Sequence, residues 1–348
     1  MTKLIDGQVS FHLPEIKRVL PTKRHPSYAT VEAENLKFIP SLRRPYYRNG
    51  DELACNLEDL HALWGCLVNP SSTTSRSIQY AHWISNWFAV DDLLSDAEKA
   101  GCFPEVAEAV ISEIVPVLQY RDFDHGEGEH RRAAKSTLYP IYADMPEGIR
   151  GRFIGEMLEF VTLYQQEVEM RMRGEIPDFP AYMAIHTASG CWCNTTLAEH
   201  GLGMDLTTEL QQYPNLRQAC RIVHESFVYA NDLFSFRKEY FQGDYGNAIS
   251  VFMLNEGLSL QESVDKLCSL IEEAESRFTV LRRQILSGPL GSRSDIRAYL
   301  DELGYCMSGN LEWSYLTPRY HGTGFVWNGQ RSGTVVLTPE RTSFGDGP

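Results

Sequence analysis

Apolar residues recur with a helical period along most of this chain, and this pattern constrains the fold more than any other feature. From about residue 51 to 320 they fall three and four positions apart, while the alternation typical of strands is nearly absent. Breakers rich in Gly, Pro and Asn separate the stripes. The clearest stripes cover residues 53–67, 105–119, 148–173, 207–242 and 259–287. The pattern predicts an all-α bundle of about ten helices.

The chain has 348 residues, which would suit either two average domains or one large one. No internal repeat and no long linker divides it, so we expect one helical domain over residues 51–321. Five prolines interrupt residues 1–50, and this segment is expected to be an extended arm with one short helix, packed over the domain as a lid or strap. Residues 322–348, rich in Gly, Thr and Ser, are expected to be a flexible tail.

Charge and composition exclude several classes of function. A formal net charge of -14, without a basic stripe, disfavours binding to nucleic acid or to anionic membrane, so a phosphate-bearing substrate would need a metal bridge. No apolar run approaches the roughly 20 residues that span a bilayer. No signal-peptide pattern is present, and the eight cysteines form no CxxC pair. We expect a cytoplasmic protein with reduced thiols, either a monomer or a homodimer.

An aromatic, apolar segment ends abruptly in the carboxylates of Asp91, Asp92 and Asp96. Trp87 and Phe88 precede Asp91 by four and three positions, so the carboxylate continues the helix face of the large aromatics. Burying an unpaired carboxylate is costly, and Mg²⁺ prefers oxygen ligands. The segment predicts Asp91 as a metal ligand, with Asp92 and Asp96 as outer or switching acids. An ordinary solvated helix end would also fit this pattern.

A second polar cluster places Asn231, Ser235 and Glu239 at i, i+4 and i+8 of one predicted helix. Successive turns then align an amide oxygen, a hydroxyl and a carboxylate, which together suit a hard metal ion. Lys238 lies beside them as a point charge suited to phosphate. A plain polar helix face remains the alternative for this segment alone. The two clusters together indicate a metal site, because each follows aromatic residues and both would face one cavity.

These residues resemble two motifs of the microbial class I terpene synthase family, Asp-Asp-x-x-x-Asp/Glu and Asn-Asp-x-x-Ser-x-x-x-Glu. In this chain they read Asp91-Asp92-x-x-x-Asp96 and Asn231-Asp232-x-x-Ser235-x-x-Lys238-Glu239. Two further marks of the family follow in order, Gly246-Asn247 and Asn310-Leu-Glu-Trp313-Ser314-x-x-x-x-Arg319-Tyr320. The resemblance covers about residues 12–321. It implies a single-domain, all-α class I terpenoid synthase bundle with a central apolar cavity.

By this resemblance the chain would be a magnesium-dependent lyase that ionises a linear isoprenyl diphosphate and cyclises the carbocation. Three Mg²⁺ ions would hold the diphosphate, since metal ions and cations stabilise charge on a departing pyrophosphate. The implied metal ligands are Asp91, Asn231, Ser235 and Glu239. The implied diphosphate-binding residues include Lys238, Arg319 and Tyr320.

A carbocation also needs a water-poor cavity with aromatic faces. The aromatics at helical offsets from the implied ligands are Phe88, Trp313, Trp87 and Phe227. We favour Phe88 and Trp313 first, although each of the four would also serve as an ordinary core residue.

The chain departs from the family pattern at His186, where the family usually places an arginine that senses diphosphate. Three and four positions later, Ser189 and Gly190 occupy the family's linker and effector positions. Histidine must be protonated to replace arginine and cannot offer the same planar fork. Three interpretations stay open: a stand-in sensor, compensation by another cation such as Arg237 or Arg319, or weakened activity.

The sequence leaves several functions open. Farnesyl diphosphate is the default substrate and a sesquiterpene hydrocarbon or alcohol the default product. Geranyl and geranylgeranyl diphosphate remain alternatives, the last implying a diterpene synthase. A prenyl-elongating synthase is disfavoured because the second motif is Asn-Ser-Glu and not Asp-rich. A catalytically silent helical binding protein is favoured only by His186.

Overall fold

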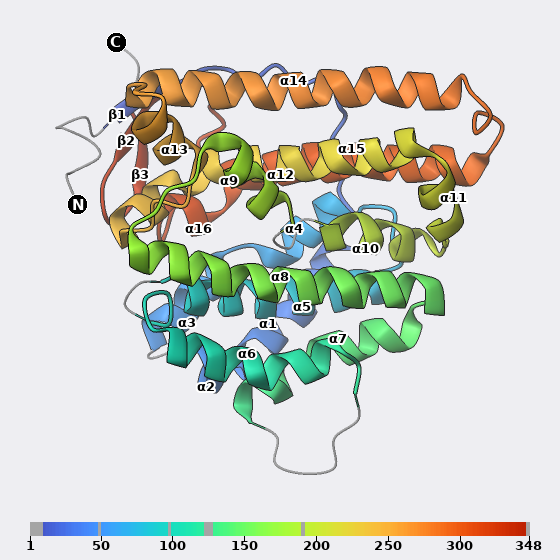
Figure 1. Ribbon diagram of the computed structural model, residues 1–348, viewed down its shortest axis with the longest axis horizontal. Coiled ribbons are helices and arrows are strands. Elements are labelled where there is room, and N and C mark those ends of the chain that lie inside the picture. The colour runs from blue at the N-terminus through green and yellow to red at the C-terminus, as the bar shows by residue number, and fades with distance from the viewer. Residues whose placement is uncertain (1–9, 48–49, 97–98, 122–127, 189–191, 346–348) are drawn as a thin grey trace.

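The computed structural model describes residues 10–47, 50–96, 99–121, 128–188 and 192–345. Within these ranges the chain forms sixteen α-helices and three short strands (Figure 1). The helices are α1 (Tyr28–Phe38), α2 (Arg43–Tyr46), α3 (Gly50–Glu58), α4 (His61–Val68), α5 (Thr74–Ser95), α6 (Pro104–Leu118), α7 (Glu129–Asp144), α8 (Glu147–Arg173), α9 (Phe179–Ala188), α10 (Trp192–Leu202), α11 (Thr207–Gln212), α12 (Pro214–Gln242), α13 (Ala248–Asn255), α14 (Leu260–Leu286), α15 (Ser294–Leu316) and α16 (Pro318–His321). The predicted all-α class is confirmed. None of the described helices is long and apolar enough to cross a membrane.

The helix count exceeds the predicted ten partly because two predicted stripes are each divided. The stripe at 53–67 breaks at Leu60, whose left-handed φ of 58° separates α3 from α4. Helix α15 stabilises this break, because the Trp313 Nε1–H donates to the Leu60 carbonyl oxygen at 3.0 Å. The stripe at 207–242 breaks at Tyr213, since Pro214 lacks an N–H and begins the next helix, α12.

Helix α12 is the central element of the bundle and packs against both α14 and α15 (Figure 1). It is buried from Ala219 to Arg237 apart from a few positions, so its polar side chains face protein or a cavity. The helix ends at Gly243, which adopts φ 75° and lets the Asp244 N–H bond the Glu239 carbonyl oxygen at 2.9 Å. The Asn231–Glu239 segment is therefore held in the last three turns of a rigid, buried helix.

Helix α5 carries the first acidic segment. Its N-cap Thr73 accepts a hydrogen bond from the Arg76 N–H, and the helix packs against α1, α4, α7 and α8. Most of its length is buried, including Trp83 and Trp87. The burial ends near Asp91, which brings the acidic pair to the edge of the core.

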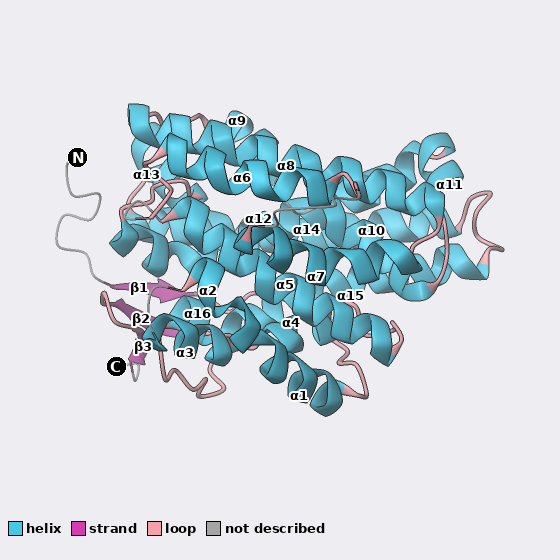
Figure 2. Cartoon of the chain, turned by 90° about the horizontal axis from the view of Figure 1, so that it is seen from below, coloured by secondary structure: helices cyan, strands magenta, loops and turns pink. Residues whose placement is uncertain are grey.

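The tail differs from the expected flexible segment. Strands β2 (Gly333–Leu337) and β3 (Thr342–Gly345) join β1 (Ser10–Leu13) in a three-stranded antiparallel sheet at one end of the bundle (Figure 2). The β-branched Thr-Val-Val run alternates its faces, so Val335 and Leu337 are buried while their neighbours are less so. This run is too short to predict a strand from the sequence alone, because Gly-rich segments surround it.

The N-terminal arm packs as a strap along α14. The His12 N–H donates to Gln261 Oε1 at 2.7 Å, and the Val19 N–H donates to Glu275 Oε2 at 2.7 Å. These contacts satisfy backbone groups of an extended segment that has few partners of its own. After the strap, α1 packs against α4 and α5, so the helical bundle already begins at Tyr28.

Candidate active site

A cavity of about 460 Å³ lies inside the bundle. Its lining comes from α4, α5, α8, α9, α10, α12, α13, α15 and α16, together with loop residues that include the turn after α12. The two polar clusters singled out in the sequence meet here, although about 140 residues separate them in the chain. Twelve of the predicted site residues line this cavity: Trp87, Phe88, Asp91, His186, Phe227, Asn231, Ser235, Lys238, Glu239, Trp313, Arg319 and Tyr320.

Two of the predicted acids do not line the cavity among the described residues. Asp92 turns toward the cations of the neighbouring helices, as detailed below. Asp96 follows the last residue of α5, and its carboxylate lies 3.7 Å from the Lys99 ammonium. Asp91 itself faces the cavity, where its carboxylate accepts a hydrogen bond from the Tyr164 hydroxyl of α8.

The second cluster forms a connected polar face on α12. The Asn231 amide donates to the Tyr320 hydroxyl at 2.6 Å. The Asn247 amide donates to Glu239 Oε2 at 2.8 Å and lies 3.5 Å from Ser235 Oγ. Asn247 also caps α13 through its side-chain oxygen, so this residue links two of the three predicted ligands, Ser235 and Glu239, to the start of the next helix.

Two of the predicted diphosphate-binding cations are held by one acid in this structure. The Lys238 ammonium lies 2.5 Å from Asp92 Oδ1, and the Arg319 guanidinium makes a fork to both Asp92 oxygens at 2.8 and 2.9 Å. Burial alone would raise the pKa of Asp92, but these two cations outweigh it and hold that pKa well below its ordinary value. This cluster of three side chains joins α5, α12 and α16 beside the polar end of the cavity, which is called the mouth from here on.

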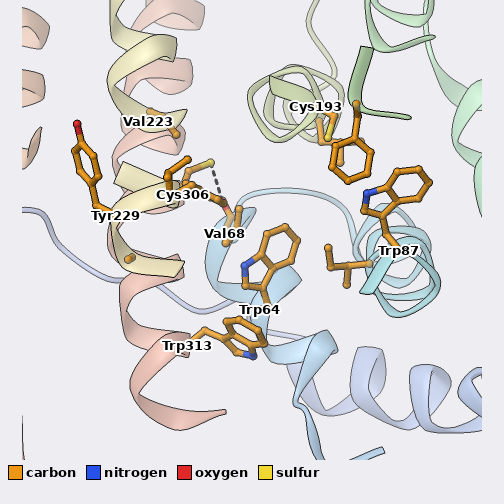
Figure 3. Packing of buried hydrophobic residues seen from close by; sticks show 14 of the residues in the cluster. Trp64, Val68, Trp87, Cys193, Val223, Tyr229, Cys306 and Trp313 are labelled. Atoms are coloured by element: carbon orange, nitrogen blue, oxygen red, sulfur yellow. Dashed lines mark hydrogen bonds between the residues drawn. The ribbon is translucent and has the colours of Figure 1, made fainter. Parts of the chain in front are cut away.

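Aromatic side chains form the rest of the wall. The rings of Phe88 and Trp313 stack at a centroid distance of 5.7 Å with 7° between their planes. Figure 3 shows Trp64 of α4 and Trp313 of α15 lying close together, with Trp87 further along the same apolar region. The rings of Trp64 and Phe227 meet edge-on with their centroids 6.3 Å apart, and the ring centroids of Phe160 and Trp87 are 4.8 Å apart. Trp64 and Phe160 belong to none of the sequence motifs described above, so their place in the wall is a finding of the structure.

His186 lies on α9 and faces the cavity. Its ring stacks on Tyr182 at a centroid distance of 4.0 Å, and its Nε2 lies 3.8 Å from Glu167 Oε1. Burial lowers the pKa of His186 to about 4, and the nearby Arg171 guanidinium acts in the same direction. The imidazole is therefore neutral in the ligand-free protein. The predicted linker Ser189 and effector Gly190 lie outside the described residues.

One proposed compensating cation is directed elsewhere. Arg237 donates through Nε to the Tyr320 carbonyl oxygen and through Nη1 to the Pro339 carbonyl oxygen, both at 2.9 Å. It thus ties α12 to the tail and does not line the cavity, so its suggested role beside His186 is wrong. Arg171 of α8, which no motif indicated, does line the cavity. Only the fold brings it there.

The charges around the cavity are unbalanced. Six acidic and three basic side chains line it among the described residues. Burial, assisted by neighbouring acids, raises the pKa of Glu239 to about 7 and that of Glu167 to about 8. No three His, Cys, Asp or Glu side chains of the described ranges come together as a ready-made metal site. Cations that accompany an anionic ligand would favour the ionised form of these carboxyl groups.

This architecture is the fold of class I terpene synthases. The structure aligns with linalool/nerolidol synthase from Streptomyces clavuligerus, solved in complex with 2-fluorogeranyl diphosphate, with a TM-score of 0.72. The two share 19% sequence identity over 86% of this chain and 98% of the other. At that identity the likeness concerns the fold.

The chain belongs to the terpene synthase family. Residues 82–277 match the family described as terpene synthase family 2, C-terminal metal binding. Sesquiterpene synthase 1 of Postia placenta is 32% identical over 267 residues, which are 76% of each chain. Microbial Terpene synthase-like protein 13 of Selaginella moellendorffii is 27% identical over 328 residues, covering 91% of this chain and 89% of the relative.

Proposed function

We propose that this protein is a magnesium-dependent terpene cyclase that ionises farnesyl diphosphate and cyclises the cation to a sesquiterpene hydrocarbon or alcohol. The observation that carries the proposal is the division of one cavity into a mouth of oxygen donors and cations and a floor of aromatic rings. Such a division suits a substrate with an anionic head and a long apolar tail. The catalytic unit would comprise residues 51–321 together with α1, which packs against α4 and α5.

The donor set at the mouth fits a hard divalent cation. Asp91 faces it from α5, while Asn231, Ser235 and Glu239 face it from α12. Mg²⁺ takes few protein oxygens and completes its shell with water and phosphate oxygens, so these donors from two helices would suffice for a site that the substrate completes. When bound, Mg²⁺ would neutralise charge on the diphosphate leaving group. Asp92 and Asp96 would support Asp91 from outside.

The chain's own cations would bind the diphosphate. Lys238 and Arg319 would exchange the carboxylate of Asp92 for diphosphate oxygens, and the Tyr320 hydroxyl would donate to a third oxygen. These donors stabilise the charge that develops as the bond from carbon to oxygen breaks and its electron pair leaves with the diphosphate. Ser189 and Gly190 keep the linker and effector roles that the family resemblance implies.

The aromatic floor would protect the cation. Phe88, Trp313, Trp87 and Phe227 present ring faces whose negative quadrupoles attract a carbocation without reacting with it. Their packing also excludes water until the ring closures are complete. The relatives from Postia placenta are named sesquiterpene synthases, and these names support a fifteen-carbon substrate for this chain.

The decisive experiment incubates the purified protein with Mg²⁺ and, separately, with geranyl, farnesyl and geranylgeranyl diphosphate. Gas chromatography with mass spectrometry then identifies the organic products. A cyclic fifteen-carbon product from farnesyl diphosphate alone is expected. A cyclic twenty-carbon product would replace the sesquiterpene proposal with a diterpene one, and the lack of any product from a folded protein would contradict the catalytic proposal.

A further inference from the structure

Arg171 is a cation of the cavity wall that none of the sequence motifs includes. It lies in the last turn of α8, and its side chain is 14% exposed. Its Nη2 donates to Asp244 Oδ2 at 3.0 Å and its Nη1 donates to the Gly101 carbonyl oxygen at 2.9 Å. Its Nε is buried without a hydrogen-bond partner among the described residues. A guanidinium carries five N–H donors, so this fork is incompletely used.

Arg171 shares its corner of the cavity with His186. Glu167, one turn before Arg171 on α8, lies 3.8 Å from the His186 ring nitrogen. The positive charge of Arg171 acts against protonation of that ring, together with burial. The corner therefore holds one permanent cation, and it is the arginine and not the histidine.

The other two cations of the wall are committed to a different acid. Lys238 and Arg319 both pair with Asp92, on the side where α5 and α16 meet. Arg171 instead pairs with Asp244. Asp244 lies in the turn that follows α12, five residues after Glu239. The cations thus approach the mouth from two sides, with Asp244 on one side and Asp92, assisted by Asp91, on the other.

We infer that Arg171 binds the substrate diphosphate and supplies the guanidinium contact that position 186 lacks in this chain. This inference rests on the proposed function. Diphosphate carries more negative charge than one carboxylate and presents paired oxygens, so it would displace Asp244 from the arginine fork. Asp244 keeps the guanidinium oriented until the ligand arrives. No proton transfer is needed, because arginine is charged at every working pH.

The competing explanation is structural: the ion pair between Arg171 and Asp244 could only fasten α8 to the turn after α12. Two variants separate the explanations, because both break this ion pair but only one removes the cation. They are Arg171→Met and Asp244→Asn. If the pair is a fastening, the two changes have the same effect. If Arg171 binds diphosphate, only Arg171→Met weakens the binding of pyrophosphate.

The test measures binding of inorganic pyrophosphate in the presence of Mg²⁺ by isothermal titration calorimetry. We expect Arg171→Met to weaken binding by roughly tenfold or more, the usual cost of a charge-assisted contact. Asp244→Asn should bind as tightly as the wild type or more tightly. Adding His186→Arg to Arg171→Met should recover part of the lost affinity. Equal losses in both single variants, or no loss in Arg171→Met, would overturn the inference.

Folding and the underlying function are controlled separately. Circular dichroism melting curves establish that each variant is folded, and Arg171→Lys, which keeps the charge but loses the fork, is measured if Arg171→Met does not fold. Arg171→Lys should bind more weakly than the wild type; unchanged affinity would overturn the role of the fork.

A wild type that neither binds pyrophosphate nor converts any isoprenyl diphosphate contradicts the proposed function itself. A wild type that does both, with indistinguishable variants, contradicts only the role of Arg171.

Discussion

The mouth and the floor of the cavity differ in how their side chains are paired. At the mouth, carboxylates hold cations in ion pairs, Asp92 with Lys238 and Arg319 and Asp244 with Arg171. The cations of such pairs can take another anion in place of the carboxylate, because each cation then keeps a partner throughout.

The floor offers almost no exchangeable partner. The indole nitrogens of Trp83 and Trp87 and the side-chain oxygen of Asn194 are buried without hydrogen-bond partners among the described residues. The surrounding rings contact one another through faces and edges. The comparison teaches that one cavity can combine an adaptable, charged end with a fixed, dry end, which is what an ionisation followed by a guarded cation requires.

The largest expected effect concerns the mouth. Asn231→Ala should lower turnover by a factor on the order of 10²–10³, since it removes one oxygen donor from the site where leaving-group charge develops. Product formation from farnesyl diphosphate measures the rate, and the melting temperature checks the fold. An unchanged rate would remove Asn231 from the metal site and weaken the assignment of the whole α12 face.

Asp92→Ala tests whether the mouth is held by its central acid. Arg319 is almost fully buried and would lose its fork, although Asp91 remains within 3.1 Å. We expect the free energy of unfolding to fall by about 2 kcal/mol, because a buried cation is left under-compensated. Urea denaturation at neutral pH measures the change. Asp96→Ala is the control and should change stability much less, because the Asp96 carboxylate lies 3.7 Å from the Lys99 ammonium and does not pair with the buried Arg319.

Lowering the pH should reproduce this loss in the unmodified protein. The cations hold the pKa of Asp92 below its unfolded value of about 4, so the stabilisation is present above that value and is lost as the pH falls through the folded pKa. Urea midpoints measured at successively lower pH should therefore fall more steeply for the wild type than for Asp92→Ala. Parallel decreases in both proteins would show that other groups dominate.

Phe227→Leu tests the floor with a residue one turn before Asn231 on the same helix. Loss of a ring face should change the product mixture and slow cyclisation by roughly tenfold, the order of a desolvated cation–π contact. Affinity for Mg²⁺ with pyrophosphate should stay unchanged, because that ligand reaches only the mouth. A large loss of pyrophosphate affinity would show that the two ends are not independent.

The smallest expected effect is a gain in stability. Asn194 lines the floor and is 5% exposed, and its Oδ1 has no partner among the described residues. Asn194→Leu should raise the free energy of unfolding by about 1 kcal/mol, because an unpaired buried polar atom is removed. Differential scanning calorimetry measures the shift. A clear loss of stability instead would indicate that the carboxamide is hydrogen-bonded, for example to water in the cavity.

The sequence was a good guide where function imposes a local spacing. The four-residue interval of Asn231, Ser235 and Glu239 predicts a single helix face, and the three residues line one cavity. The long stripes of α6, α8 and α14 were predicted to within one residue at each end, because a continuous helical period extends through each of them. Nine of the twelve predicted site residues that line the cavity lie on the long helices α5, α12 and α15, whereas Arg319 and Tyr320 lie on the four-residue α16.

Predictions failed where a distant part of the chain decides the local structure. The break at Leu60 depends on hydrogen bonds from Trp313 and Thr317, more than 250 residues away. The tail forms strands because β1 supplies a partner from the other end of the chain. The local sequence around Leu60 or in the tail contains no information about these distant partners. It therefore predicts a continuous helix at Leu60 and a flexible tail.

By itself, the sequence determined the helical class, the two segments with oxygen side chains at metal-ligand spacing, and the family to which the chain belongs. The reason is that helix periodicity and ligand spacing are local properties of neighbouring residues. The tertiary structure alone decided that Asp92 holds Lys238 and Arg319, that Arg237 points to the tail and that Arg171 enters the cavity. Those outcomes depend on how rigid helices cross, since the crossing sets which long charged side chains meet across the core.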